Sequence, residues 1–544
     1  MKKKIYVCCI LTVISTAFLF AQNSGITLPD VTTVVSGDAL TAGKNAVPDF
    51  SEVLPSVSES KTVLPELPEV PAGKNAGADE TVSKTAPENS VYAEGLIGGG
   101  GPGVFNGNFS VYRSAGTDPF RIGFNYESAD GYARNSFTDG FYDRTAAITG
   151  KKTFTTKNAA YELSGSYESV GNGLQNQGEE FYDVTKQTVA GKADAAWTLP
   201  GGFSLHSDVN TGWYNRFAGI TSITGSPAAA DYAEKSAVFS LSPSARLGWG
   251  TGGFSSYFSA AWYLQSDTAG VLSSGNTNRA RFGTGLGWKN DFIAVYGDAA
   301  AVIGTELGGT PVVVPFTLGV NSSFVTGLSS RKTALSAEGG IASEQPLYAD
   351  LEKKYTFSEL SFIPGETSDW YGKITAAVPV KDILSFTAEA EYRQTAFGNG
   401  VWEPDYEDGF AYGQYTYKQT DRSLLCTDTG ISFSKGILTL RGSWKAQWLY
   451  VPVLETPDTI AVSVSLQGSD SRWGAGTEIS LSPDENADHM PELNFSGFYR
   501  LTKAVRLAVT ADDVVKLITG ESRTYAGRYI TRSGSTGFVI KFFF

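Results

Sequence analysis

The chain has 544 residues, and its 56 acidic and 43 basic side chains give a formal net charge of −13. This acidic balance argues against nucleic acid and against an anionic lipid surface as partners. Three cysteines and two histidines leave little material for a disulfide framework, a metal site or a histidine-based catalyst. We therefore expect no catalytic residue, no bound metal and no cofactor.

The first 21 residues have the pattern of a secretory signal peptide. Three lysines (Lys2, Lys3 and Lys4) precede an apolar run over residues 5–20, and the small Ala21 stands at a plausible cleavage point. The run is too short for a membrane-spanning helix, and its flanks fit cleavage. One cysteine, Cys426, lies beyond this segment, so we expect no intramolecular disulfide in the mature chain.

Residues 22–90 differ in composition from everything that follows. They contain repeated Leu-Pro pairs, a short duplication of Ala-Gly-Lys-Asn-Ala (residues 42–46 and 72–76) and almost no aromatic residues. Such a segment cannot bury enough apolar surface to offset the entropy lost on ordering. We predict an extended, largely disordered periplasmic arm, which its prolines make semi-rigid.

From Val91 to the end of the chain, apolar and polar residues alternate with the period of two that is typical of β-strands. Clear examples are residues 120–127, 384–393 and 438–450. These runs reach about ten to fifteen residues, longer than most soluble strands and long enough for a tilted membrane crossing. The pattern predicts a transmembrane β-barrel over residues 91–544, with twelve strands before residue 330 and ten after it.

The connections between the predicted strands alternate in length, as in barrels with both chain ends in the periplasm. Aromatic residues near strand ends fit interfacial girdles: Tyr126, Trp213, Trp262, Trp370 and Tyr450. Gly98 to Gly103 reads as a tight loop between the first two strands, since no helix follows to make a phosphate cradle. Short turns are expected at 115–118, 200–202, 289–290, 379–382, 435–436 and 502–503, and long external loops at 129–141, 170–185, 217–232, 267–278, 396–409 and 484–490.

The last strand resembles the closing strand of bacterial outer-membrane barrels, whose C-terminal aromatic residue is a recognition signal for the barrel-assembly machinery. Phe538, Ile540, Phe542 and Phe544 would face lipid and carry this signal. Their neighbours Val539, Lys541 and Phe543 would then face the lumen. The resemblance implies the outer membrane as the location, with its lipid and the assembly machinery as partners.

Residues 331–450 resemble the middle of the barrel of TonB-dependent receptors. A strand leads into a loop with Pro346-Leu347-Tyr348, and residues 364–368 (Pro-Gly-Glu-Thr-Ser) open a strand that enters through Tyr371-Gly372. Residues 507–514 and 527–529 resemble the last hairpin of that family. The resemblance implies a barrel of 22 strands that takes up or recognises a substrate at the cell surface.

The family's plug domain has no counterpart of sufficient length here, because fewer than a hundred residues precede the first strand. A 22-stranded barrel is wide enough to need closing. Either the loops and the arm obstruct the lumen, or a partner protein supplies a plug. A segment resembling a TonB box, through which a TonB-like energiser would pair by strand addition, consists of Asp30, Val31, Thr32, Thr33, Val34, Val35 and Ser36.

Polar residues on the lumen-facing rows are candidates for a substrate path, although a hydrated interior explains them equally well. Ser204, His206 and Asp208 are spaced along one strand, so their side chains do not converge as a catalytic triad must. Acidic residues at 403–408 could hold calcium in an external loop, but a solvated acidic loop is the favoured interpretation. The lumen candidates are Arg121, Glu127, Glu162, Glu168, Glu389, Glu391, Arg393, Arg441 and Lys445.

Three functions remain open from the sequence. The favoured one is a receptor or transporter that resembles TonB-dependent receptors. The others are a passive porin-type channel and a surface adhesin or scaffold that binds through its long external loops.

Overall fold

A computed structural model describes residues 91–543 apart from short gaps (114–117, 133, 179–180, 222–226, 305–311, 330, 382, 450–457, 470, 484–489, 521–523, 526, 531 and 533). The predicted signal peptide, the predicted arm, the segment resembling a TonB box and the terminal Phe544 lie outside the described residues. Within the described part of the chain, no helix has the length and hydropathy of a membrane-spanning helix.

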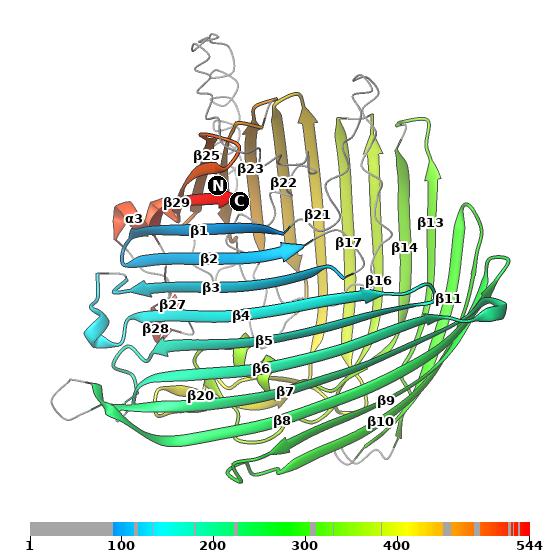
Figure 1. Cartoon of the computed structure of the whole chain (residues 1–544), viewed down its shortest axis with the longest axis horizontal. Coiled ribbons are helices and arrows are strands. Elements are labelled where there is room, and N and C mark those ends of the chain that lie inside the picture. The colour runs from blue at the N-terminus through cyan, green and yellow to red at the C-terminus, as the bar shows by residue number, and fades with distance from the viewer. Residues whose placement is uncertain are drawn as a thin grey trace. The chain divides into compact units, whose positions relative to one another are not determined.

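Twenty-two strands form one closed antiparallel barrel (Figure 1). Each strand pairs with the next along the chain, and β29 pairs back with β1 to close the cylinder. The strand number and its division around residue 330 confirm the sequence prediction. The strands are β1 (Tyr92–Gly101), β2 (Val104–Arg113), β3 (Phe120–Asp130), β4 (Tyr142–Thr155), β5 (Ala159–Gly173), β6 (Phe181–Thr198), β7 (Phe203–Thr221), β8 (Pro227–Thr251), β9 (Phe254–Asp267), β10 (Asn276–Lys289), β11 (Ile293–Gly304), β13 (Phe316–Val325), β14 (Lys332–Glu344), β16 (Thr367–Val380), β17 (Leu384–Thr395), β21 (Ser423–Lys435), β22 (Leu438–Gln447), β23 (Thr459–Gln467), β24 (Trp473–Leu481), β25 (Glu492–Arg500), β26 (Val505–Asp512) and β29 (Ser535–Phe543).

The remaining elements are short. Among the described residues they are β12 (Val312–Val313), which pairs with β11, and a set within the connections between barrel strands. These are the helices α2 (Tyr348–Lys354) and α3 (Val514–Thr519), the 3-10 turns Phe137–Asp139 and Pro200–Gly202, and the strands β15 (Ser358–Glu359), β18 (Val401–Pro404), β19 (Phe410–Ala411), β20 (Gln414–Thr420), β27 (Thr524–Tyr525) and β28 (Tyr529–Ile530).

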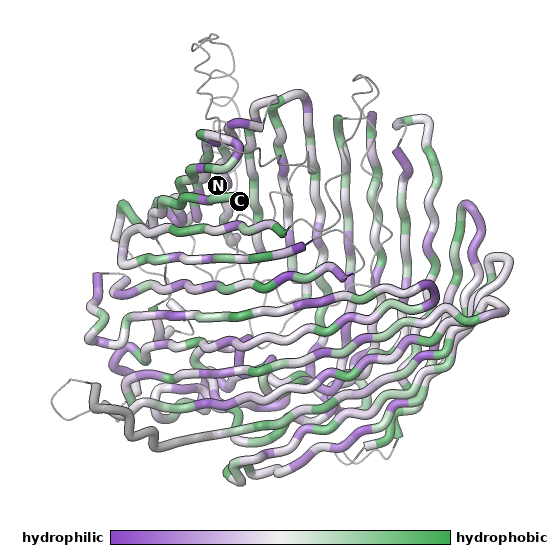
Figure 2. The backbone as a smooth tube through the Cα atoms, viewed as in Figure 1, coloured by the Kyte–Doolittle hydropathy of each residue, from purple (hydrophilic) through white to green (hydrophobic). Residues whose placement is uncertain are grey.

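One face of the barrel wall is apolar and exposed, as lipid contact requires. Cross-strand register links Phe109, Phe124, Ile148, Tyr167, Val189 and Trp213 into a single row over β2 to β7. Each of these side chains is between 37% and 55% exposed. Apolar and polar residues alternate along the strands that carry them (Figure 2). We call this apolar side the lipid face and the opposite side the lumen face.

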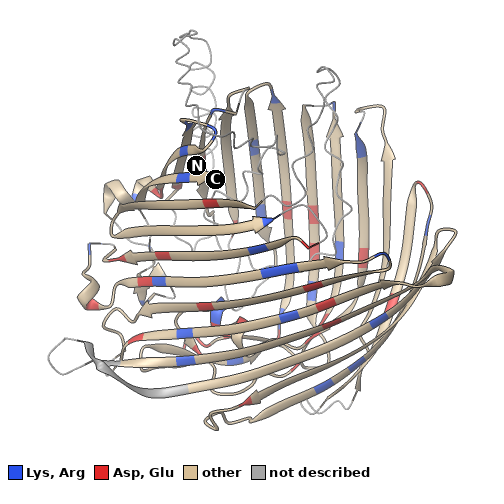
Figure 3. Cartoon of the chain, viewed as in Figure 1, with Lys and Arg blue, Asp and Glu red and all other residues tan. Residues whose placement is uncertain are grey.

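The lumen face carries charged side chains at the alternate positions. Lys373 of β16 lies 2.6 Å from Glu389 of β17, while the neighbouring Ile374 is 62% exposed on the lipid face. Lysine, arginine and acidic residues are spread over many strands of the barrel (Figure 3). A wall with one apolar face and one charged face identifies a transmembrane barrel with a hydrated interior.

Gly98 to Gly101 do not form the predicted loop but continue strand β1, and the turn contains only Pro102 and Gly103. The reason is the close approach of β29 at the closing seam. A Cβ atom on Gly100 would lie 1.7 Å from the carbonyl oxygen of Thr536, and one on Gly98 would lie 2.8 Å from that of Phe538. Glycine therefore permits the closing strands to meet here.

Two predicted long loops are shorter than expected. The connection between β5 and β6 spans residues 174–180, and that between β7 and β8 spans 222–226, because the flanking residues stay paired in register. Three connections at the same end of the barrel are long. They run from 345 to 366, from 396 to 422 and from 513 to 534. We call this end the long-loop end and the opposite end, with its tight connections, the short-turn end.

Candidate functional site: a loop cap on the lumen wall

The three long connections are joined to one another at the long-loop end, and we call them together the loop cap (residues 345–366, 396–422 and 513–534). Strand β15 from the first pairs in parallel with β20 from the second. Strands β18 and β19 pair antiparallel with the same β20. Segments between different barrel strands thus share one small sheet.

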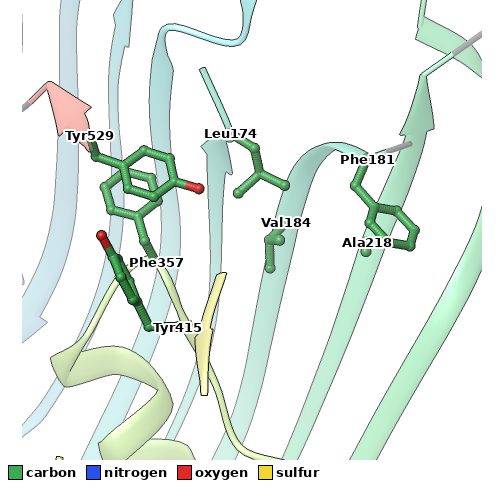
Figure 4. Packing of buried hydrophobic residues seen from close by; sticks show 7 residues of the cluster. All are labelled: Leu174, Phe181, Val184, Ala218, Phe357, Tyr415 and Tyr529. Atoms are coloured by element: carbon green, nitrogen blue, oxygen red, sulfur yellow. The ribbon is translucent and has the colours of Figure 1, made fainter. Parts of the chain in front are cut away.

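An aromatic cluster attaches the third connection to the other two (Figure 4). The rings of Phe357 and Tyr529 stack with centroids 3.7 Å apart and parallel planes. The Tyr529 hydroxyl donates a hydrogen bond to the carbonyl oxygen of Gly413. Together with Tyr415 they pack on Leu174, Phe181, Val184 and Ala218, which belong to the barrel wall and the adjoining loop.

The wall residues in this cluster lie on the lumen face. Val189 and Trp213 are on the lipid face, so alternation places Val184 of β6 and Ala218 of β7 on the other side. These two residues are direct cross-strand partners. The loop cap therefore folds inward, against the inner surface of the barrel, instead of extending away from it.

A second apolar cluster repeats this arrangement further along the wall. Tyr348, Tyr355 and Leu360 of the loop cap pack against Tyr214 of β7 and Val238 of β8. The Tyr348 hydroxyl donates to the carbonyl oxygen of Leu360 at 2.6 Å. Burying several aromatic side chains explains why a connection of this length is ordered, since the apolar area removed from water offsets the entropy of ordering.

Glu352 of α2 connects the loop cap to the wall by charge. Its carboxylate is fully buried and lies 3.3 Å from the Lys186 ammonium and 3.9 Å from the Arg216 guanidinium. The Tyr214 hydroxyl donates to it at 3.0 Å, and so does the backbone N–H of Leu360 at 2.6 Å. Lys186 and Arg216 are cross-strand partners, so two buried cations face one carboxylate from the cap.

The second acid of this cluster completes the charge balance. Glu359 lies 2.7 Å from Arg216, which also donates to Gln414 of β20. Lys186 further donates to the carbonyl oxygens of Glu352 and Thr356, at 2.5 and 3.2 Å. A buried ion cluster of this kind does little for net stability, but removing one member leaves an uncompensated buried charge.

Other ion pairs attach the loop cap around the wall. Glu366, just before β16, lies 2.5 Å from Arg279 of β10, and Ser343 donates to it. Arg422, just before β21, lies 2.5 Å from Asp369 of β16. Burial raises the pKa of the Glu366 carboxyl to about 7, although the Arg279 guanidinium acts in the opposite direction.

The structure places the predicted lumen candidates on the lumen face, but it distributes them around the barrel rather than gathering them. Glu389 and Glu391 contact Lys373, and Arg393 contacts Glu391 and Asp369. Lys445 lies 3.9 Å from Asp428, and Arg121 lies 3.0 Å from Glu94. Glu162 pairs with Lys151, and Arg441 faces Ser432 and Ser463 across the sheet.

Two of the candidates reach the loop cap. Glu127 lies 3.2 Å from Arg532 of the third connection, and Glu168 lies 2.5 Å from Lys353 of α2. Sequence reasoning missed the buried members, Lys186, Arg216 and Glu352. The sequence does contain one signal of this burial: residues 348–362 are rich in tyrosine and phenylalanine, which is unusual for a loop exposed to solvent.

The remaining sequence candidates give no catalytic or metal geometry. His206 lies 2.9 Å from Asp194 of the adjacent strand, and Asp208 accepts from Asn210 at 2.7 Å. Glu403 is buried, so the predicted solvated acidic loop is wrong at this residue. Glu403 lies in β18, which pairs with β20. Asp405, by contrast, is partly exposed and lies 3.0 Å from Lys418. No group of metal-ligating side chains occurs among the described residues.

The closing strand has the predicted orientation. Phe538 is 45% exposed on the lipid face, and Ile540 and Phe542, two and four residues further along the strand, lie on the same face. Lys541 lies on the lumen face, 3.7 Å from Glu94.

Comparison of the sequence with protein-family models and with curated proteins gives no match. Solved structures do match the fold. The copper transporter OprC has a TM-score of 0.62 at 11% identity, covering 84% of this chain and 80% of its own. The FrpB iron transporter from Neisseria meningitidis gives 0.60 at 8% identity, covering 84% and 82%, and a mutant ferric enterobactin receptor PfeA from Pseudomonas aeruginosa gives 0.60 at 10%, covering 84% and 80%.

The fold is that of the barrels in these transporters and receptors, and it agrees with the resemblance to TonB-dependent receptors seen in the sequence. Residues 331–450, which carry the resemblance in the sequence, form β14 to β22 with the first two connections of the loop cap, and Tyr371-Gly372 lies within β16 as the resemblance implies. The described residues form one compact unit and include no separate plug domain. In the described part of the chain, the loop cap lies against the lumen face of the barrel wall.

Proposed function

We propose that this protein is an outer-membrane transporter or receptor whose substrate enters or is recognised at the long-loop end, on the cell surface, with the loop cap as its gate. The fold shared with transporters and receptors supports the transport class. Copper, iron and ferric enterobactin are named for the similar proteins, and this similarity does not assign a substrate to the present chain. Coupling through residues 30–36 to a TonB-like energiser, and closure from the periplasm by a partner, belong to the same proposal.

One observation carries the proposal: Glu352 of the loop cap is buried between Lys186 and Arg216 on the lumen wall. A pore for free diffusion needs an unobstructed lumen, whereas these loops are fixed to its inner surface by buried charges and aromatic packing. A gate requires a packed and a released arrangement, and losing one partner of a buried charge cluster would favour the released one.

The test is the concentration dependence of uptake. Cells with and without the protein are given a mixture of solutes, depletion is followed by mass spectrometry, and each depleted solute is then titrated. Saturable uptake of a restricted set of solutes supports a transporter or receptor. Uptake that rises linearly with concentration for all small solutes supports the passive porin instead. Unchanged uptake, together with loss of surface binding on deletion of 396–422, supports the adhesin.

A further inference from the structure

Five connections at the short-turn end of the barrel carry a basic residue and an apolar residue, within the connection or at its edge. Both members of each pair are exposed. The apolar members have exposed fractions between 39% and 66%. The five pairs, which we call the basic rim, are Lys289 with Phe292, Arg331 with Leu328, Lys381 with Ile383, Lys435 with Ile437 and Lys503 with Leu501.

The basic rim occupies one arc of the barrel, between β10 and β26. The sixth connection of this arc, between β23 and β24, repeats the pattern with Arg472 beside the exposed Trp473. Outside the arc, the connections 199–202 and 252–253 contain no charged residue, and 156–158 has Lys157 without an apolar neighbour. Basic and apolar residues therefore occur together on one side of the short-turn end rather than at every turn.

The five cations of the basic rim outnumber the acids beside them. None of the five forms an ion pair with another residue in the part of the chain that the structure describes. The acids that the sequence places in the connections of this arc are Asp291, Asp382 and Asp470. The arc therefore presents an excess of positive charge, although the whole chain has a net charge of −13. Recognition of a charged partner depends on this local distribution and not on the total.

The basic rim continues the lipid face. Ile431 is 45% exposed on that face, and Lys435 lies four residues further along β21, so alternation puts both on the same side. Trp288, which is 46% exposed, is also on the lipid face and directly precedes Lys289. A lysine in such a position covers apolar surface with its stem and extends its ammonium toward the lipid headgroups.

The apolar members favour a lipid over a soluble acidic partner. A side chain such as Phe292, which is 66% exposed, is stabilised by leaving water, and the interface of a bilayer provides that environment. A soluble acidic protein would match the cations but would give no reason for an apolar residue beside each of them. An anionic phospholipid carries both kinds of group, a negative phosphate and the acyl chains next to it.

We propose that the basic rim binds anionic phospholipids, with its cations on the phosphate groups and its apolar residues against the acyl chains. The barrel then gathers these lipids along one arc of its short-turn end. Cations close to an anionic membrane surface each add to the attraction, and salt screens it. The proposal concerns the rim of the barrel and does not depend on transport.

The test is native mass spectrometry of the intact, detergent-solubilised protein, titrated with phosphatidylglycerol and, separately, with phosphatidylethanolamine of the same acyl chains. We expect phosphatidylglycerol to bind more tightly, with a preference that falls as salt is added. Lys435→Gln and Lys503→Gln should each weaken phosphatidylglycerol binding about fivefold, the effect of one cation at an anionic surface, and should leave phosphatidylethanolamine binding nearly unchanged. Ile437→Ser should weaken the binding of both lipids, because it acts on the acyl chains.

Lys192→Gln is the matched control. The Lys192 side chain is 45% exposed, but it lies three residues from the lipid-facing Val189 and therefore on the lumen face. This variant should bind both lipids as the unmodified protein does.

Equal affinity for the two lipids overturns the proposal. A preference that Lys435→Gln and Lys503→Gln leave unchanged, or that Lys192→Gln reduces equally, overturns it as well. Full competition by soluble glycerol phosphate would show that the rim binds a free phosphate and not a lipid. Absence of a lipid preference, together with retention of an acidic periplasmic protein that these rim variants abolish, would assign the arc to a protein partner and also refute lipid binding.

Discussion

Glu352 and Lys353 are adjacent on α2, yet their ion pairs differ in environment. The Glu352 carboxylate is fully buried beside Lys186 and Arg216, whereas Lys353 and Glu168 are both about one-third exposed. Removing one partner from a buried cluster costs about 3–5 kcal/mol, while an exposed pair contributes about 1 kcal/mol or less. Substituting these two neighbouring residues one at a time therefore compares the loss of a buried ion pair with the loss of an exposed ion pair.

Glu352→Gln is expected to release the loop cap, because it leaves Lys186 and Arg216 with too little negative charge. Limited proteolysis of the detergent-solubilised protein should cleave residues 345–366 much faster than in the unmodified chain. Lys353→Gln is the control and should change the cleavage rate little. Equal rates for the two variants would contradict the role assigned to Glu352.

Glu366 predicts a pH dependence of the loop cap. Its pKa of about 7 in the packed cap exceeds the ordinary value of 4.5 in a released, solvated loop, so the packed state binds the proton more tightly. The stability that protonated Glu366 adds to the packed loop cap is complete below about pH 4.5 and is lost as the pH rises through 7. Protease resistance of the cap should fall over this interval, and Glu366→Gln should flatten the profile. A profile in Glu366→Gln that still falls between pH 5 and 7 would refute the assignment.

At the scale of elements, β20 depends on a close approach at Gly413. This residue has φ +78°, and a Cβ atom there would lie 2.6 Å from the Cα atom of Gly178 in the connection between β5 and β6. Gly436 has a similar φ of +61° in a tight turn, with open space around it. Alanine at either position would carry the strain of a left-handed backbone, about 1–2 kcal/mol. Only at Gly413 would its Cβ atom also collide with a neighbouring backbone.

Gly413→Ala is therefore expected to loosen the loop cap, and Gly436→Ala is not. Hydrogen exchange measured by mass spectrometry should show faster exchange over residues 414–420 in the first variant alone. Protection of β20 that is the same in both variants would show that the approach to Gly178 is not required.

Strand β6 offers a matched test of the two barrel faces. Val189 is 53% exposed on the lipid face, and the next residue, Ala190, points into the lumen. A lysine on the lipid face costs about 2–4 kcal/mol at mid-depth, whereas the lumen accommodates charge. Urea unfolding in lipid vesicles should show a large decrease in the free energy of unfolding for Val189→Lys and a small decrease for Ala190→Lys. Similar losses would mean that the faces are assigned incorrectly.

At the scale of the whole molecule, the sequence predicts the barrel well because strand alternation is a local property. The twelve strands before residue 330 and the ten after it follow from runs such as 384–393, whose polar residues all reach the lumen. Gly98 to Gly101 were misassigned because their extended conformation depends on β29, which lies more than four hundred residues later in the chain.

The loop cap could not be derived in the same way. Glu352, Lys186 and Arg216 come from α2, β6 and β7, so their meeting depends on how a long connection folds back across the lumen. Alternation predicts which wall residues face inward, but it does not predict which loop covers them.

The proposed gate closes the lumen at the long-loop end, and conductance across a planar bilayer measures this closure directly. The intact, unmodified protein should hold a low conductance, and Glu352→Gln should add large, frequent openings while Lys353→Gln behaves as the unmodified protein. A large, steady conductance in the unmodified protein, left unchanged by Glu352→Gln, would contradict closure by these loops.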